Sequence, residues 1–116
     1  ASVHAGDCPV NRAFALALLL GVGLVVRPAP REPHRHLVEI RDMAFHPATL
    51  VLAVGDTVVW INRDMLPHTA TASDTTRLDT GELLRDGRAW FVADRVGEVA
   101  YLCRLHPVMQ GTLRIR

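Results

Sequence analysis

Short runs of apolar and β-branched residues separated by turn signals fill the chain from residue 37 to residue 116. The runs at 49–54 and 57–61 flank Gly55-Asp56, a pair typical of a hairpin turn. Further strands are predicted at residues 37–41, 68–72, 89–93, 99–103 and 111–116. A polar stretch, residues 74–87, predicts a long connection. About seven short strands in this space predict an all-β fold, either a sandwich or a small barrel.

A different pattern precedes the strands. Residues 13–26 are apolar and uncharged, and Arg12 and Arg27 bound them. A helix that crosses a bilayer needs about 20 such residues, so this run has the length of a signal-peptide hydrophobic region. No good cleavage site follows it, because the next residues are Arg27-Pro28-Ala29-Pro30. Residues 1–26 are therefore predicted to be a signal-like or membrane-anchor segment, and the alternative is a buried core helix.

The segment 27–36 contains three prolines and no large apolar residue. Such a composition is typical of an extended linker. The expected organisation is a terminal segment at 1–26, a Pro-rich linker at 27–36 and a folded domain at 37–116. We expect the domain to be exported, to the periplasm or the outer face of the cytoplasmic membrane, with a possible membrane tether through residues 13–26.

Composition narrows the class of function. The chain has 116 residues with 13 basic and 12 acidic side chains, for a formal net charge of +1. This balance argues against a nucleic-acid partner, since binding to phosphates depends on a surplus of basic groups. Cys8 and Cys103 lie in such different surroundings that no internal disulfide is expected.

The candidate chemistry lies near the end of the chain. Cys103, His106 and Met109 follow one another at intervals of three residues in a loop that leaves a predicted strand. A thiolate, an imidazole and a thioether suit copper, and two histidines and one cysteine with a weak axial methionine form the blue-copper electron-transfer site. His68 opens a separate predicted strand and is the candidate for the second histidine.

Each of these residues has an ordinary interpretation when taken alone. A lone cysteine at a strand end is usually a small buried hydrophobe, and a lone methionine usually belongs to the core. The two histidines would be unremarkable in loops. The combination of four soft or borderline ligands at strand ends favours a metal site. His46 has no other candidate ligands beside it in the sequence and is interpreted as a surface turn residue.

The chain from about residue 38 resembles the plastocyanin/azurin family of cupredoxins, and within it the amicyanins. The resemblance rests on the stretches 45–47, 54–63, 67–68, 79–81 and 101–111. Two residues between His106 and Met109 match the short ligand loop of amicyanins. The resemblance implies an eight-stranded Greek-key sandwich with one copper ion, cycling between Cu(I) and Cu(II), held by His68, Cys103, His106 and Met109.

The function that the resemblance implies is electron transfer between redox proteins outside the cytoplasm, without enzymatic activity. Donor and acceptor would dock transiently at the His106 end of a monomer, where Met65, Leu66, Leu105, Pro107 and Val108 would supply apolar surface. The alternative is a copper-binding module for storage or delivery. One departure from the family is Thr69, because amicyanins and plastocyanins usually carry Asn directly after the first histidine ligand; its hydroxyl would tie the two ligand loops with a shorter reach.

Overall fold

A computed structural model describes residues 21–116 of the chain. Most of the predicted segment 1–26 and Cys8 lie outside the described residues. The chain divides into two units at Pro30, and residues 21–30 form neither helix nor strand. No helix within residues 21–116 is long and apolar enough to cross a membrane.

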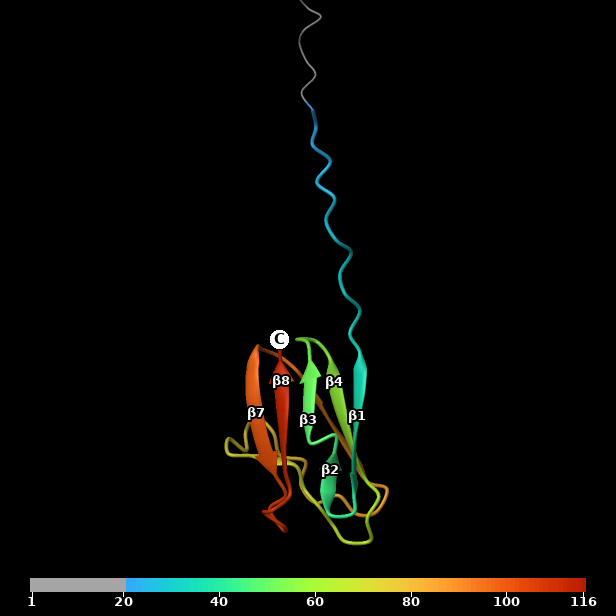
Figure 1. Cartoon of the computed structure of the whole chain (residues 1–116), viewed down its shortest axis with the longest axis vertical. Coiled ribbons are helices and arrows are strands. Elements are labelled where there is room, and N and C mark those ends of the chain that lie inside the picture. The colour runs from blue at the N-terminus through green and yellow to red at the C-terminus, as the bar shows by residue number, and fades with distance from the viewer. Residues whose placement is uncertain (1–20) are drawn as a thin grey trace, which may run out of the picture. The chain divides into compact units, whose positions relative to one another are not determined.

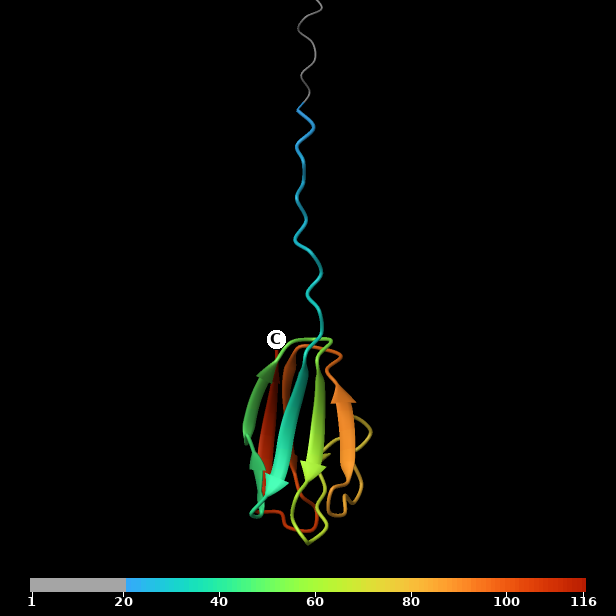
Figure 2. The same cartoon turned by 90° about the vertical axis from the view of Figure 1, so that its right-hand side faces the viewer.

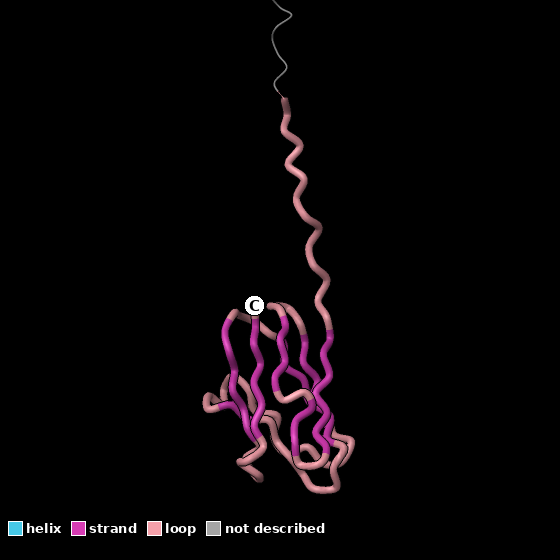
Figure 3. The backbone as a smooth tube through the Cα atoms, in the orientation of Figure 1, coloured by secondary structure: helices cyan, strands magenta, loops and turns pink. Residues whose placement is uncertain are grey.

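The second unit, Arg31–Arg116, is built from β-strands joined by turns and loops (Figures 1 and 3). The eight strands are β1 (Arg35–Arg41), β2 (Ala44–His46), β3 (Thr49–Leu52), β4 (Thr57–Asn62), β5 (Thr71–Ala72), β6 (Arg88–Val92), β7 (Gly97–Leu102) and β8 (Gln110–Ile115). They form two four-stranded sheets, ordered β2-β1-β4-β6 and β3-β8-β7-β5. Both sheets are mixed, because β1 pairs with β4 and β3 with β8 in parallel. The predicted all-β sandwich is thus confirmed.

The predicted hairpin around Gly55-Asp56 is wrong. β3 belongs to one sheet and β4 to the other, so the turn carries the chain between the two layers (Figure 2). Gly55 has a φ of 97°, which favours glycine, and its amide donates to the carbonyl of Ala93 in a different connection. The apolar run before the turn pairs with β8 instead of folding back on its neighbour, and local sequence gave no sign of that long-range pairing.

The core lies between the sheets. β1, β4 and β8 direct alternate residues inward, and Val38, Ile40, Val58, Trp60 and Leu113 are fully buried. This alternation is what a strand with one covered face requires.

An aromatic cluster joins the two layers. The ring of Tyr101 on β7 meets Phe45 at 4.8 Å and Trp60 at 5.4 Å between centroids, in edge-to-face geometry. Burial raises the pKa of Tyr101 to about 12. The phenol therefore stays neutral over the pH range in which most proteins work. Tyr101 lies only two residues before Cys103.

A buried carboxylate secures the beginning of the folded unit. The side chain of Asp56 is fully buried and accepts two hydrogen bonds from Arg31, at 2.8 and 3.1 Å. It also pairs with the ring of His36 at 2.9 Å and accepts from the amides of His34 and Ala53. Hydrogen bonds from Arg31 and the His34 amide hold the pKa of Asp56 far below its usual range, although burial opposes them. Arg31, His34 and His36, which come from the predicted linker 27–36, therefore pack on the sandwich, and β1 begins at Arg35.

Candidate metal centre

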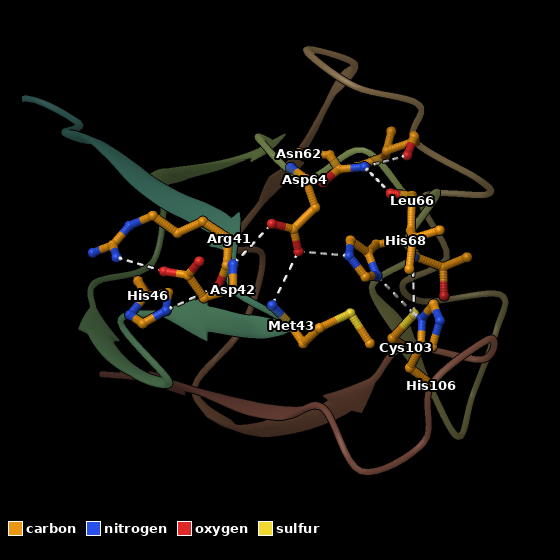
Figure 4. A network of polar contacts seen from close by, with 12 residues as sticks. Arg41, Asp42, Met43, His46, Asn62, Asp64, Leu66, His68, Cys103 and His106 are labelled. Atoms are coloured by element: carbon orange, nitrogen blue, oxygen red, sulfur yellow. Dashed lines mark hydrogen bonds and ion pairs between the residues drawn. The ribbon is translucent and has the colours of Figure 1, made fainter.

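Three of the four predicted ligands meet at one end of the sandwich. The candidate donor atoms of His68, Cys103 and His106 all lie within 4.8 Å of one another. The two imidazole rings stand 5.0 Å apart between centroids, at 64° to each other. Figure 4 shows both rings turned toward the sulfur of Cys103. His68 and Cys103 are fully buried, whereas His106 is partly exposed.

The distances fit a shared metal ion. The Nδ1 atom of His68 lies 3.8 Å from Cys103 Sγ, and that of His106 lies 3.7 Å from the same sulfur. With bonds of about 2.0–2.1 Å to nitrogen and about 2.3 Å to sulfur, a trigonal metal would leave each nitrogen about 3.8 Å from the sulfur. The two nitrogen–sulfur distances are therefore the ones that a trigonal site requires.

The fourth predicted ligand, Met109, closes the same loop. Its amide donates to the carbonyl of His106 at 2.9 Å, and its carbonyl accepts from the amide of Cys103 at 3.1 Å. The amide of His106 in turn donates to the carbonyl of Cys103 at 3.2 Å. Met109 is buried, with 3% of its surface exposed. These turns confine a thiol, an imidazole and a thioether to one short loop between β7 and β8.

His68 lies in the connection that leads from β4 in one sheet to β5 in the other. Its backbone pairs with Leu83 through two hydrogen bonds, of 3.1 and 2.7 Å. The buried side chain of Asn62 donates to the carbonyls of Leu66 and Leu83, at 2.8 and 2.7 Å, and accepts from the amide of Asp64. This network fixes the loop that carries His68 (Figure 4).

Asp64 orients the His68 ring. Its carboxylate lies 2.8 Å from His68 Nε2 and accepts from the amides of Asp42 and Met43, at 2.8 and 3.0 Å (Figure 4). Burial opposes ionisation of Asp64, but these hydrogen bonds outweigh it and lower the pKa of the carboxyl group. An ionised carboxylate only accepts, so Nε2 carries a proton, and it is Nδ1 that faces Cys103.

The partners of Asp64 form a tight turn between β1 and β2. Asp42 and Met43 both have positive φ, 53° and 60°, in a region that residues other than glycine rarely occupy. Hydrogen bonds from both amides to Asp64 hold this turn against the loop that carries His68. Sequence reasoning missed Asp64, and its position four residues before His68 was the one available signal.

Thr69 connects the two ligand loops, as the sequence indicated. Its amide donates to Cys103 Sγ at 3.3 Å, and its hydroxyl oxygen accepts from the amide of Arg104 at 2.9 Å. The residue is 1% exposed. The side chain of Thr69, the residue after His68, therefore binds Arg104, the residue after Cys103.

No family model matches the chain. Amicyanin of Paracoccus denitrificans is 32% identical over 80 residues, which cover 65% of this chain and 60% of that protein. Amicyanin of Paracoccus versutus is 27% identical over 82 residues, with the same two coverages. The chain thus matches about three fifths of the length of these curated relatives.

Solved structures of amicyanin superpose on the same region. The Cu(I) form of one amicyanin variant gives a TM-score of 0.68 at 26% identity, covering 76% of this chain and 88% of that one. An oxidised variant gives 0.66 at 28% identity, covering 71% and 82%. The resemblance inferred from the sequence is confirmed by both kinds of comparison.

Proposed function

The chain is a cupredoxin similar to amicyanin, and from that premise we propose that it is a blue-copper electron-transfer protein. The observation that carries the proposal is the pair of imidazole Nδ1 atoms facing Cys103 Sγ at 3.8 and 3.7 Å. In this proposal His68, Cys103 and His106 would hold one copper ion, and the thioether of Met109 would be a fourth, weaker donor. Copper bound by this set supplies a one-electron couple between Cu(II) and Cu(I).

The protein's contribution is to keep its ligands in place through both oxidation states. Cys103 must give up its proton to ligate, and the amide of Thr69 remains as a donor to the sulfur. Asp64 keeps the proton of His68 on Nε2 and so keeps Nδ1 available. Because both ligand loops are fixed by backbone hydrogen bonds, little movement accompanies the transfer of an electron.

We propose that electrons enter and leave at His106, since His68 is fully buried and His106 is partly exposed. The two ligand loops expose apolar side chains, with Met65 at 77% and Val108 at 87%. Leu66 and Leu105 add to this surface at 51% and 43%. A small apolar surface suits redox partners that bind briefly and dissociate quickly.

The setting of the protein is also a proposal. The apolar residues 13–26 between Arg12 and Arg27 favour export, with the folded unit outside the cytoplasm as a monomer that is either released or tethered. Fusing residues 1–36 to a reporter that is active only after export tests this. An inactive reporter would contradict an exported location.

The function is tested by adding Cu(II) to the purified chain and recording absorption and electron paramagnetic resonance spectra. The expected result is one copper per chain with an intense visible band from Cys103-to-copper charge transfer. Cys103→Ser should abolish the band, because the thiolate is its source. A colourless complex that exchanges copper readily would favour storage or delivery instead, and a band that survives Cys103→Ser would overturn the ligand assignment.

A further inference from the structure

A chain of polar side chains runs from the ligand loops to the surface and is not accounted for by the ligand set. The hydroxyl of Thr71 lies 3.0 Å from that of Thr69 and 3.1 Å from Asp79 Oδ1. Thr69 and Thr71 are buried, at 1% and 4% exposure. The side chain of Asp79 is 27% exposed, so this series of hydrogen-bonded side chains ends at the solvent.

The directions of the hydrogen bonds in this series of side chains are determined at its outer end, Asp79. The carboxylate of Asp79 only accepts, so Thr71 donates its hydroxyl proton there. The hydroxyl oxygen of Thr71 is then free to accept from Thr69. The oxygen of Thr69 is left to accept from the amide of Arg104, at 2.9 Å. Each of the two hydroxyl groups both donates and accepts, which is the fully satisfied arrangement that buried hydroxyls need.

The outer end is itself fixed from two sides. The amide of Gly81 donates to Asp79 Oδ1 at 3.0 Å. The guanidinium of Arg104 approaches the same carboxylate at 3.4 Å. Arg104 therefore meets the chain twice, through its amide at Thr69 and through its side chain at Asp79. The residue directly after Cys103 is held in a closed ring of contacts.

From this geometry we infer that Thr69, Thr71 and Asp79 act together as positioning residues for the Cys103 thiolate, a role that rests on the proposed copper function. The hydroxyl of Thr69 reaches the Arg104 amide by itself, and Thr71 and Asp79 fix the orientation of that hydroxyl from behind. The ring sets the position of Arg104 and with it the approach of Cys103 Sγ to the amide of Thr69. A thiolate that loses this hydrogen bond donates more charge to Cu(II), so loosening the ring lowers the reduction potential.

The first test uses the copper-free protein and measures hydrogen exchange at the Arg104 amide by NMR. Thr69→Val keeps the shape of the side chain and removes the acceptor, so exchange should accelerate tenfold or more. Thr69→Ser restores a hydroxyl and should restore protection. Thr75→Val, at an exposed position, is the matched control and should change nothing. Unchanged exchange in Thr69→Val, or equal exchange in the Val and Ser variants, would overturn the inference.

The second test measures the visible band and the reduction potential of the copper-loaded variants. Thr69→Val should lower the potential and shift the band, and Thr69→Ser should stay near the native values. Asp79→Asn, at the exposed end, keeps the fold intact and should give a smaller shift in the same direction. If native protein forms the blue site but none of these variants moves the potential, the inference fails and the proposed function stands. If native protein forms no blue site, the function fails, and the exchange test still decides the hydroxyl ring.

Discussion

Gly111 on β8 faces the ring of Tyr101, and this contact makes a sharp test of how closely the core of the sandwich is packed. The two residues are paired across β7 and β8. A Cβ atom built on Gly111 would lie 2.3 Å from Tyr101 Cζ and 2.4 Å from its hydroxyl oxygen. Ordinary carbon contacts begin near 3.5 Å, so the ring would have to move by about 1 Å or more. Phe45 and Trp60 pack against the same ring and leave it little room.

Gly111→Ala should therefore cost about 3 kcal/mol, the upper end of the usual range for overpacking a buried site. For a domain of 60–100 residues each kcal/mol lowers the melting temperature by about 4–8 °C, so a decrease of about 12–24 °C is expected. Thermal and urea unfolding followed by circular dichroism measure this. Ala100→Val, on the neighbouring strand at an exposed position, adds side-chain volume to open space and should change stability by less than about 0.5 kcal/mol.

A double-mutant cycle identifies the contact responsible. Tyr101→Leu removes the ring that Gly111→Ala would strike, at the cost of a cavity. The combined variant should be more stable than the sum of the two single losses predicts, by at least about 1 kcal/mol. Strictly additive losses, or a Gly111→Ala protein as stable as the native one, would refute the steric reasoning.

Three further predictions concern the ligand loop and the beginning of the fold. Met109→Leu should keep the visible band and raise the reduction potential in a redox titration, because the weak axial donor is lost; complete loss of copper binding would contradict an axial role. Asp56→Asn should be less stable at neutral pH in urea unfolding, and its stability should fall less on acidification. The pKa of Asp56 is lowered by folding, so its contribution to stability is complete above the ordinary carboxyl pKa of about 3.9 and is lost as pH falls toward the folded value. The same loss of stability on acidification in the native protein and the variant would contradict this. A chain starting at Arg31 should match the full chain in urea unfolding, whereas one starting at Leu37 should unfold at lower urea; equal midpoints would show that the contacts with Asp56 contribute nothing.

Much of the sandwich and its candidate ligands could be predicted because they leave local signals. The alternation of apolar residues marks most strands, and three ligands share one short loop with regular spacing. The pairing of strands could not be predicted, since β3 and β8 meet across more than half of the folded unit. The same limit hid the partners of Asp56, because Arg31 lies 25 positions away from it. The role of Asp64 could not be predicted for a different reason, because a surface carboxylate and one that orients an imidazole look alike in a sequence.

The two ends of β4 carry buried polar networks with different tasks. Asp56 precedes the strand and secures the beginning of the folded unit, and Asp64 follows it and holds His68. A strand of this length spans about 17 Å, whereas the carboxylate of Asp64 lies 2.8 Å from His68 Nε2. Because the Coulomb energy falls with distance, charge at the Asp56 end should influence the candidate metal site far less than charge at Asp64 does.

Matched substitutions at both ends test this separation. Asp64→Asn removes an ionised carboxylate that touches His68, so Cu(II) loses more stabilisation than Cu(I) and the reduction potential should rise. Asp56→Asn should shift the potential much less than Asp64→Asn and leave the visible band unchanged while it lowers the urea midpoint. Redox titration of the two copper-loaded variants compares them directly. Equal shifts in potential would mean that the whole sandwich, and not the carboxylate beside His68, sets the electronic properties of the site.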